Sequence, residues 1–326
     1  MASSSSCLTL PTDNTPHLMN RPTLEFHHVS AIAGDPQENV DFYTGVLGLE
    51  FVKQTVNFDE KFIYHLYYGD ERGSPGSLIT FFPYQRGAEG RVGRPQPSAV
   101  ALAIPNGAIQ YWRDRFENRD VAVEEPVERF GETVLRFRDH DGQPLELVAG
   151  ETDRPPITGS IPSEYAICGL HSVTLLSSSI FHTAATLEVL GFSLAGQEGD
   201  RVRYRALGAS AATVDLLDVE ASYGREGIGT VHHVAFRAGD RSLSEWRERL
   251  IDAGLEPTRI KDRRYFESIY FREPGGILFE IATDAPGFTV DEDRSNLGTQ
   301  LQLPPQYEAD REMITQQLPE LTRPDL

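Results

Sequence analysis

Two histidine pairs and one carboxylate in this chain have the residue types of a metal site. The sequence His-His-Val occurs at residues 27–29 and again at 232–234, each time at the start of a segment expected to be a strand. Glu280 lies inside a later apolar segment, 277–282, where an apolar residue would be expected. Two imidazoles and one carboxylate on one face of a metal, with open positions opposite, are typical of non-haem iron and its oxygen chemistry.

The elements that would position these residues repeat along the chain. One constant shift brings residues 97–150 into register with 231–284 without a gap, and Trp112 then falls on Trp246. Each segment has the pattern of an apolar strand, an amphipathic helix around the Trp, and three extended runs joined by turns. The same order of strand, helix and strands is visible in 25–83 and 168–219 (the latter in its strand–helix start and its last extended run).

The fold predicted from these repeats is α+β, with four βαβββ units. The predicted parts of the chain are a flexible tail at 1–23, a first pair of units at 24–150, a linker at 151–166, a second pair at 167–284, and a C-terminal extension at 285–326 with a short helix at 306–318. We expect Tyr307, Met313 and Ile314 to be the apolar contacts of that helix.

The bulk composition argues against several classes of partner. The chain has 326 residues, of which 39% are hydrophobic, so it can bury a substantial core. Its net charge of −19 argues against binding to nucleic acid or to an anionic membrane surface. No apolar run approaches the roughly 20 residues of a membrane span, and two cysteines are too few for a disulfide framework. We therefore expect a cytoplasmic protein, and the question of a homo-oligomer stays open.

Comparison of the repeats indicates which histidine of each pair would bind the metal, because successive residues of a strand face opposite sides. With the opening strands aligned on the following Val or its equivalent, the second position is His28 in the first unit and His233 in the fourth. The same position is Ala99 in the second unit and Ser172 in the third. Only the first and fourth units therefore offer an imidazole on the candidate face.

A carboxylate position follows the last turn of each unit. From the first unit to the fourth, the residues at this position are Thr80, Glu146, Asp215 and Glu280. Pairing the first unit with the fourth would place Glu280 beside His28 and His233. Pairing the second with the third would collect carboxylates without an imidazole, and Glu146 would then pair with an arginine such as Arg136. One pair of units is expected to hold a metal and the other to hold none.

His171 is the alternative ligand. It would join His233 and Glu280 if the third and fourth units shared the metal. The alignment places His171 with His27 and not with His28, so it ranks second, although a bulge of one residue would reverse the order. The remaining histidines are interpreted as surface, capping or packing residues: His17, His65, His140 and His182.

Long motifs in the first and fourth units carry a family resemblance. They lie at 24–30, 51–59, 64–70, 73–76, 80–83, 230–236 and 268–280, with a further stretch at 286–292. Together they resemble the vicinal oxygen chelate superfamily, which contains glyoxalases, bleomycin resistance proteins and extradiol dioxygenases. This resemblance implies that the four βαβββ units form two cupped mixed sheets. Within that superfamily, the chain is most similar to the hydroquinone-type ring-cleaving dioxygenases.

The resemblance implies iron(II) bound by His28, His233 and Glu280. It further implies residues around the open metal positions that take part in catalysis: His27, Ser30, His232, Arg263 and Tyr270. The implied reaction is cleavage of a hydroquinone-type or catechol ring with insertion of both atoms of O2. Two alternatives stay open on the same fold, namely a glyoxalase-like metal isomerase or thiol transferase, and a metal-free protein that binds an aromatic compound.

The residue types agree with this chemistry. Iron(II) acts as a Lewis acid that lowers the pKa of a bound hydroxyl and holds oxygen beside the ring. A nearby His or Tyr can take and return protons. Arg263 could stabilise negative charge that develops during the reaction. The expected partners are thus a small aromatic diol and O2.

Overall fold

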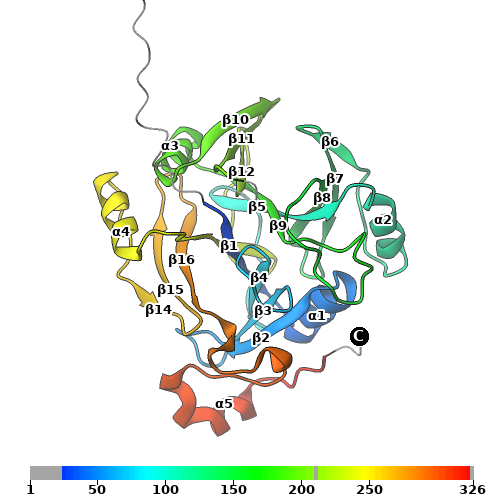
Figure 1. Cartoon of the computed structure of the whole chain (residues 1–326), viewed down its shortest axis with the longest axis vertical. Helices are drawn as coiled ribbons and strands as arrows, with labels where there is room; N and C mark the ends of the chain where they lie inside the picture. The colour runs from blue at the N-terminus through cyan, green and yellow to red at the C-terminus, as the bar shows by residue number, and fades with distance from the viewer. Residues whose placement is uncertain (1–23, 209–211, 324–326) are drawn as a thin grey trace, which may run out of the picture.

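The computed structural model describes residues 24–208 and 212–323, and it contains two mixed sheets of eight strands each (Figure 1). Helices lie around the outside of the sheets, as Figure 1 shows. The predicted fold class, two cupped mixed sheets built from βαβββ units, is confirmed. The flexible tail predicted for 1–23 lies outside the described residues. No helix in the described ranges is long and apolar enough to span a membrane.

The predicted order of one strand, one helix and three strands occurs four times. The first unit contains β1 (Phe26–Ala33), α1 (Pro36–Val40) continued by a π-helical turn η2 (Asp41–Val46), β2 (Glu50–Val56), β3 (Tyr64–Gly69) and β4 (Leu78–Pro83). The second contains β5 (Gln96–Pro105), α2 (Ile109–Glu117), β6 (Val127–Arg129), β7 (Glu132–Arg138) and β8 (Pro144–Gly150). The third contains β9 (Leu170–Leu176), α3 (Ile180–Leu190), β10 (Ser193–Glu198), β11 (Arg201–Arg205) and β12 (Thr213–Leu217). The fourth contains β13 (Thr230–Arg237), α4 (Leu243–Asp252), β14 (Lys261–Asp262), β15 (Phe266–Arg272) and β16 (Leu278–Pro286).

Each sheet joins one unit from each half of the chain. The first sheet has the order β14-β15-β16-β13-β1-β4-β3-β2, so it combines the fourth unit with the first. The second sheet has the order β10-β11-β12-β9-β5-β8-β7-β6 and combines the third unit with the second. The expected pairing of the first unit with the fourth is confirmed. The division of the chain into two parts around 151–166 stays a prediction.

Strand register confirms that the four units are equivalent at the carboxylate position. In each unit, the residue two places after the histidine position lies opposite the carboxylate position. These pairs are Ser30 with Thr80, Ala101 with Glu146, Thr174 with Asp215, and Ala235 with Glu280. The neighbouring side chains alternate between the two faces of the sheet, so all four carboxylate positions share the face of their histidine position.

The two tryptophans that the repeat aligned are equivalent anchors of the helices. Trp112 in α2 and Trp246 in α4 are both fully buried, and their indole N–H groups donate to the backbone carbonyls of Tyr165 and Ala238. A buried indole with a satisfied donor adds a large apolar area without an unpaired polar group. Each helix is thereby held against its sheet.

The C-terminal extension packs on the first sheet through a helical segment. The expected helix is present as η5 (Pro305–Asp310) followed by α5 (Arg311–Gln317). Ile314 is fully buried and Tyr307 packs against the core, as expected, but the prediction for Met313 was wrong because its side chain is 41% exposed. Met313 precedes Ile314 directly, and on a helix its side chain therefore points about 100° away from the buried one.

A buried lysine ties the extension to β2. Lys53 is fully buried, and its Nζ contacts Asp291 at 2.8 Å and also donates to Glu292 and to the carbonyl of Phe288. A buried ammonium group is tolerated only when it is paired and hydrogen-bonded. These contacts fix the path of the chain after β16 beside the first sheet.

Candidate metal centre

Three ligand-type atoms converge on one face of the first sheet. The Nε2 atoms of His28 and His233 lie 3.2 Å apart. The Oε2 atom of Glu280 lies 2.8 Å from Nε2 of His233 and 3.3 Å from Nε2 of His28. For metal bonds of about 2.1 Å, ligand atoms at right angles lie about 3.0 Å apart, so the spacing fits three adjacent positions on one face of a metal. The three residues belong to β1, β13 and β16.

The state of the carboxylate also fits a bound cation. Glu280 is fully buried, and among the described residues neither of its oxygens has a hydrogen bond of good geometry. Burial alone would raise its pKa, but the imidazoles of His28 and His233 hold the pKa well below its usual range. Burial lowers the pKa of His233 to about 4. At neutral pH the site thus presents a carboxylate anion and a neutral imidazole, the forms that bind a divalent metal.

Each candidate ligand histidine is supported by the histidine before it. Nδ1 of His27 lies 2.8 Å from Nδ1 of His28, and Nδ1 of His232 lies 2.7 Å from Nδ1 of His233. When the candidate ligand donates from Nδ1, its Nε2 lone pair is free for a metal. The repeated His-His sequence therefore supplies both the ligand and the group that orients it.

The two supporting histidines differ in their access to the site. His27 is buried, its Nε2 lies 3.1 Å from the carbonyl of Thr283, and burial lowers its pKa to about 3. It does not line the pocket described next, so it can influence the site only through its contact with His28. His232 lines that pocket, and burial lowers its pKa as well.

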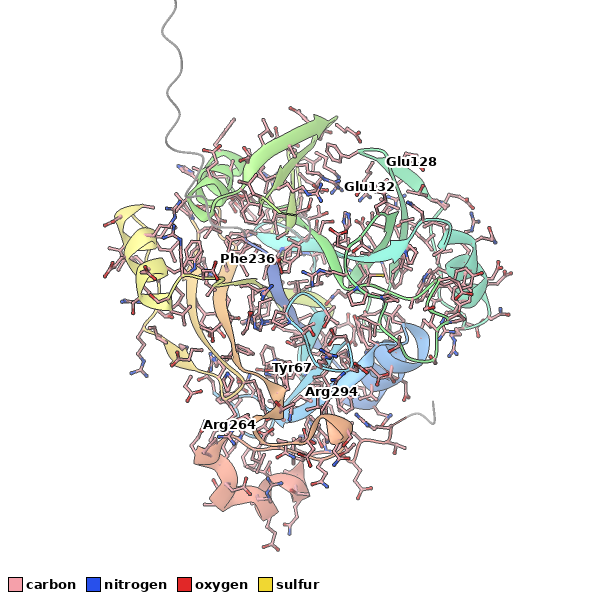
Figure 2. The ribbon with its side chains drawn as sticks, viewed as in Figure 1. Tyr67, Glu128, Glu132, Phe236, Arg264 and Arg294 are labelled. Atoms are coloured by element: carbon pink, nitrogen blue, oxygen red, sulfur yellow. The ribbon has the colours of Figure 1, made fainter. Side chains whose placement is uncertain are left out.

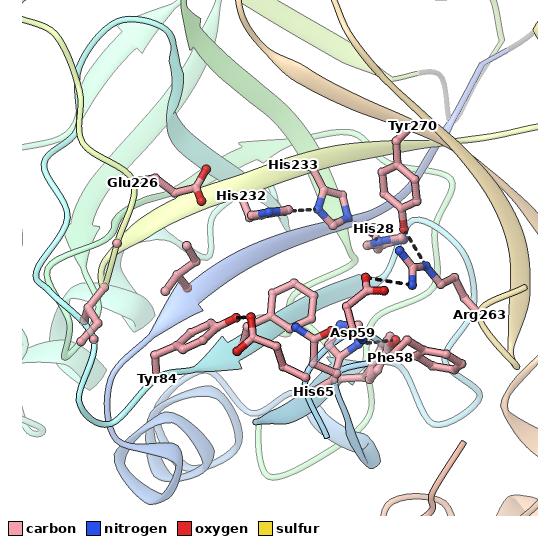
Figure 3. Close-up of a pocket in the computed structure, with 18 of the residues that line it drawn as sticks. His28, Phe58, Asp59, His65, Tyr84, Glu226, His232, His233, Arg263 and Tyr270 are labelled. Carbon is pink, nitrogen blue, oxygen red and sulfur yellow. Dashed lines mark hydrogen bonds and ion pairs between the residues drawn. The ribbon is translucent and has the colours of Figure 1, made fainter. Parts of the chain in front are cut away.

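A pocket of about 470 Å³ lies next to the two converging imidazoles (Figure 3). His28 and His233 form part of its wall. Much of the rest is aromatic, as a benzene ring would require: Phe58, Tyr67, Phe82, Tyr84, Phe266 and Tyr270. The pocket has the volume and the lining of a site for a small aromatic compound next to a metal.

Arg263 and Tyr270 lie together in this pocket, as Figure 3 shows. The Nε of Arg263 donates to the hydroxyl of Tyr270 at 3.3 Å, and the ring of Tyr270 meets that of His233 edge-on, with 5.6 Å between the ring centres. Burial raises the pKa of Tyr270, so its hydroxyl keeps its proton at neutral pH and can donate a hydrogen bond. Both residues can therefore stabilise negative charge on a ligand.

Ser30 is placed differently from the other predicted residues. It is fully buried, does not line the pocket, and its Oγ lies 2.7 Å from Oγ1 of Thr80. Thus the structure brings His232, Arg263 and Tyr270 to the pocket, whereas Ser30 and His27 do not line it. Their catalytic roles, and the metal-binding role of His28, His233 and Glu280, stay predictions.

His65 is a pocket residue that sequence reasoning treated as a surface, capping or packing residue. It is buried in β3 and lines the pocket, with Nε2 at 2.9 Å from Oγ1 of Thr80 and Nδ1 at 2.8 Å from the hydroxyl of Tyr67. Its position two residues before Tyr67 was the available signal, because alternate residues of a strand share a face. Of the others, His140 pairs with Asp141, His182 bonds to Ser179 near the start of α3, and His17 lies outside the described residues.

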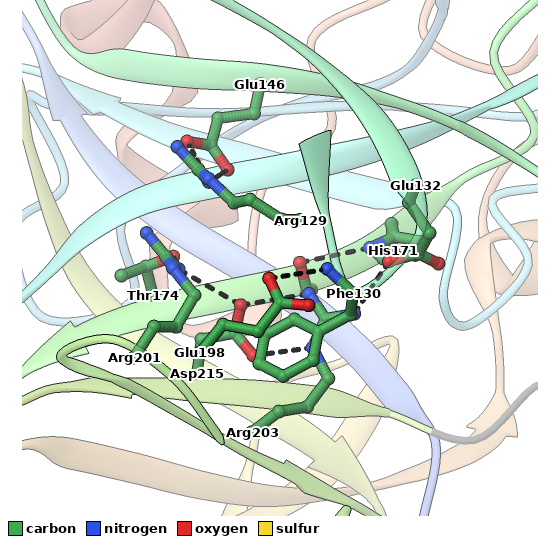
Figure 4. A network of polar contacts seen from close by, with 11 residues as sticks. Arg129, Phe130, Glu132, Glu146, His171, Thr174, Glu198, Arg201, Arg203 and Asp215 are labelled. Atoms are coloured by element: carbon green, nitrogen blue, oxygen red, sulfur yellow. Dashed lines mark hydrogen bonds and ion pairs between the residues drawn. The ribbon is translucent and has the colours of Figure 1, made fainter. Parts of the chain in front are cut away.

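The second sheet carries ion pairs where the first carries the converging atoms (Figure 4). Glu146 pairs with Arg129 at 2.8 Å, and Asp215 pairs with both Arg201 and Arg203. The expectation that Glu146 pairs with an arginine is confirmed, but the suggested partner Arg136 was wrong, since its guanidinium instead contacts Glu124. Arg136 lies in β7 directly opposite Glu146, but Arg129 arrives from the edge strand β6 and neutralises this carboxylate.

His171, the alternative ligand, also belongs to the second sheet. Its Nε2 lies 3.0 Å from Oε1 of Glu132, and its Nδ1 lies 3.0 Å from the hydroxyl of Ser172. It therefore does not join His233 and Glu280. Within 24–208 and 212–323, the one group of side chains with the spacing of a metal site is His28, His233 and Glu280.

Comparisons with known proteins agree with the architecture. A family model described as "Glyoxalase/Bleomycin resistance protein/Dioxygenase superfamily" matches residues 25–147 and 187–281. The "Putative ring-cleaving dioxygenase MhqO" of Bacillus subtilis (strain 168) is 44% identical over 304 residues, which cover 92% of this chain and 97% of the relative. The "Chlorohydroquinone/hydroquinone 1,2-dioxygenase" of Sphingobium indicum is 36% identical over 296 residues, 86% of this chain and 92% of the relative. A crystal structure of a "putative dioxygenase" from Bacillus subtilis subsp. subtilis str. 168 matches with a TM-score of 0.90 and 43% identity, covering 94% of this chain and 100% of that chain.

Proposed function

The chain belongs to the Glyoxalase/Bleomycin resistance protein/Dioxygenase superfamily, and from this premise we propose that it is an iron(II)-dependent ring-cleaving dioxygenase that acts on hydroquinone-type or catechol aromatic diols. The observation that carries the proposal is the convergence of His28, His233 and Glu280 at an aromatic pocket. The names of the relatives support the reaction class. Their coverage of nearly the whole chain supports the transfer of that class to this protein.

His28, His233 and Glu280 would hold the metal. Bound iron(II) would lower the pKa of a ring hydroxyl and bring oxygen to the ring. One carboxylate and two neutral imidazoles would leave a net charge of about +1 on the loaded site. This positive charge would favour binding of the ionised ring hydroxyl over the neutral one.

His232 is the group best placed to donate a hydrogen bond to the ionised hydroxyl or to bound oxygen. Its Nδ1 accepts from His233, so a neutral His232 carries its proton on Nε2, the atom that can reach the pocket. Burial lowers the pKa of His232, and the imidazole therefore enters the reaction neutral. A neutral imidazole with its proton on Nε2 can give that proton to a basic oxygen as a general acid.

Arg263 and Tyr270 would stabilise negative charge on the opposite side of the reacting group. Tyr270 keeps its proton because burial raises its pKa, and Arg263 adds a positive charge next to the phenol. Donors that are oriented before the reaction stabilise developing charge without further reorganisation. The aromatic wall excludes water from the ring.

Metal content and oxygen consumption together test the proposal. Protein purified without oxygen should contain about one iron per chain and should consume O2 when methyl- or chloro-substituted hydroquinone is added. Zinc or nickel without oxygen consumption would favour the isomerase or thiol transferase alternative. A protein without metal that still binds the ring would favour the aromatic-binding alternative. The cytoplasmic location also stays a prediction.

A further inference from the structure

Tyr67 occupies in the first unit the position that Tyr270 occupies in the fourth. In the strand register, Tyr67 lies opposite Thr80, as Tyr270 lies opposite Glu280. Both tyrosines line the pocket, and Figure 2 labels Tyr67. The first sheet therefore presents two equivalent tyrosines to one pocket. Tyr270 lies on the side of the fourth unit, which supplies Glu280, and Tyr67 lies on the side of the first unit.

A chain of hydrogen bonds fixes the orientation of Tyr67. Its hydroxyl lies 2.8 Å from Nδ1 of His65, and Nε2 of His65 lies 2.9 Å from Oγ1 of Thr80. Thr80 Oγ1 in turn lies 2.7 Å from the Oγ of Ser30. All four side chains are buried. The network thus uses both nitrogens of His65 and gives the Tyr67 hydroxyl one defined partner.

Either tautomer of His65 leaves the Tyr67 hydroxyl able to make another hydrogen bond. Burial lowers the pKa of His65 well below its usual range, so the imidazole is neutral and carries one N–H. With the proton on Nε2, Tyr67 donates to Nδ1 and its oxygen can accept from a ligand. With the proton on Nδ1, Tyr67 accepts from His65 and can donate to a ligand. A ligand hydroxyl, which both donates and accepts, suits both cases.

The wall that contains His65 faces the candidate metal-binding residues across the pocket. Figure 3 shows His65 on the side opposite His232 and His233. A hydroquinone carries its two hydroxyls on opposite sides of the ring. When one hydroxyl is held at the candidate metal centre, the other must point away from it. The ring of Phe82, whose centre is 4.3 Å from that of His65, provides an apolar surface beside this polar group.

We propose that Tyr67, held in place by His65, binds the ring hydroxyl that the metal does not hold, and so makes the enzyme select para-diols over phenols that lack this hydroxyl. The proposal rests on the proposed function, because it takes the first hydroxyl to be at the metal. It adds a residue that determines specificity. A site that is built to bond a hydroxyl rejects the analogue without it, since the buried polar groups then lose their partner.

Binding without oxygen gives the direct test. Iron(II)-loaded protein is titrated anaerobically with hydroquinone and with 4-methylphenol, in which a methyl group replaces the second hydroxyl. Wild type should bind hydroquinone more tightly, by roughly 5- to 10-fold for one hydrogen bond. Tyr67→Phe should bind the two ligands about equally, and its affinity for 4-methylphenol should stay near that of wild type. His65→Leu should lose the same preference, and the double variant should lose no more than either single variant.

Tyr68→Phe is the matched control. Tyr68 is the next residue of β3, it is fully buried, and its hydroxyl donates to Asn39 at 2.8 Å in the core and not in the pocket. This variant should lose stability to a similar degree and keep the preference for hydroquinone. Equal binding of both ligands by a wild type that consumes O2 with hydroquinone would overturn the role of Tyr67 and leave the proposed function intact. A loaded wild type that binds and oxidises no diol would overturn both.

Discussion

Thr80 and Glu280 occupy equivalent positions in the two units of the first sheet, but only Glu280 offers a carboxylate to the centre. Thr80 lies opposite Ser30 in β1, two residues after His28, and Glu280 lies opposite Ala235 in β13, two residues after His233. The Thr80 hydroxyl is directed to Ser30 and His65. The four equivalent positions of the two units therefore hold three candidate ligands and one threonine. No carboxylate from the first unit occupies the fourth position, which leaves room there for a substrate.

We predict that Thr80→Glu adds a fourth ligand. The variant should retain iron more strongly than wild type against a competing chelator, and it should lose turnover because the new carboxylate takes a position needed by substrate or oxygen. Thr80→Gln has nearly the same size without the negative charge, and it should not strengthen metal retention. Equal metal retention by the Glu and Gln variants would contradict the assignment of this position.

The pocket residues around the centre should affect rate more than metal content. Tyr270→Phe and His232→Ala should each slow turnover by about 10- to 100-fold, because groups that orient ligands and move protons act without holding the metal. Iron content should remain about one per chain. Tyr43→Phe removes a buried tyrosine hydroxyl that donates to Asp139 outside the pocket and should leave turnover unchanged. Loss of iron from the Tyr270 variant would mean that its role is structural.

The C-terminal extension should support the pocket through Tyr307. Its hydroxyl donates to the backbone carbonyl of Phe58 at 2.8 Å, and Phe58 lines the pocket. Tyr307→Phe should lower the free energy of unfolding by about 1 kcal/mol and raise KM for the aromatic substrate. Met313→Ala, at a position that is 41% exposed in the next helix, should change neither quantity. Stability and KM that survive removal of residues 304–326 would show that the extension has no such role.

Glu132 should make the second sheet's contribution to stability dependent on pH. Burial opposes its ionisation, but His171 and Arg203 lower its pKa to about 2. A carboxyl group with a lowered folded-state pKa stabilises the fold above its ordinary pKa of about 4.5, and this stabilisation is lost as the pH falls towards 2. Glu132→Gln should thus cost about 1 kcal/mol near pH 7, a value reduced for its partial exposure, and progressively less below pH 4.5. Denaturant titrations at several pH values measure this loss of unfolding free energy, with Glu125→Gln as an exposed control. A loss in Glu132→Gln that does not decrease on acidification would contradict the lowered pKa of Glu132.

Much of the architecture could be predicted from the sequence because the chain repeats. The repeats specified the four units, the pairing of the first with the fourth, and the face shared by His28, His233 and Glu280. Alignment of the opening strands was enough to choose His28 over His171. The strands are bulged at His27, His171 and His232, but each bulge lies one residue before the aligned position, so His28 and His233 still face the centre. The alternation of side chains depends only on the local geometry of each strand, so it can be inferred without knowledge of the tertiary structure.

Contacts between distant segments could not be predicted in this way. Arg129 reaches Glu146 from an edge strand, and no spacing in the sequence indicates that it would do so in place of Arg136. His65 lies in a run of aromatic residues, a pattern that indicates a packing role. Its partner Thr80 can be identified only from the register of β3 with β4. The helical extension was predicted, but the side of it that is buried depends on the surface it meets.

The central claim is tested most directly by following both atoms of oxygen. Iron(II)-loaded enzyme is mixed with methylhydroquinone under ¹⁸O₂, and the product is analysed by mass spectrometry, with Glu280→Gln as the matched variant. The account predicts one O2 consumed per ring opened, both labelled atoms in the initial ring-opened product, and no reaction in the variant, which should also fail to retain iron. Formation of the quinone without incorporated label, or equal activity in wild type and Glu280→Gln, would contradict it.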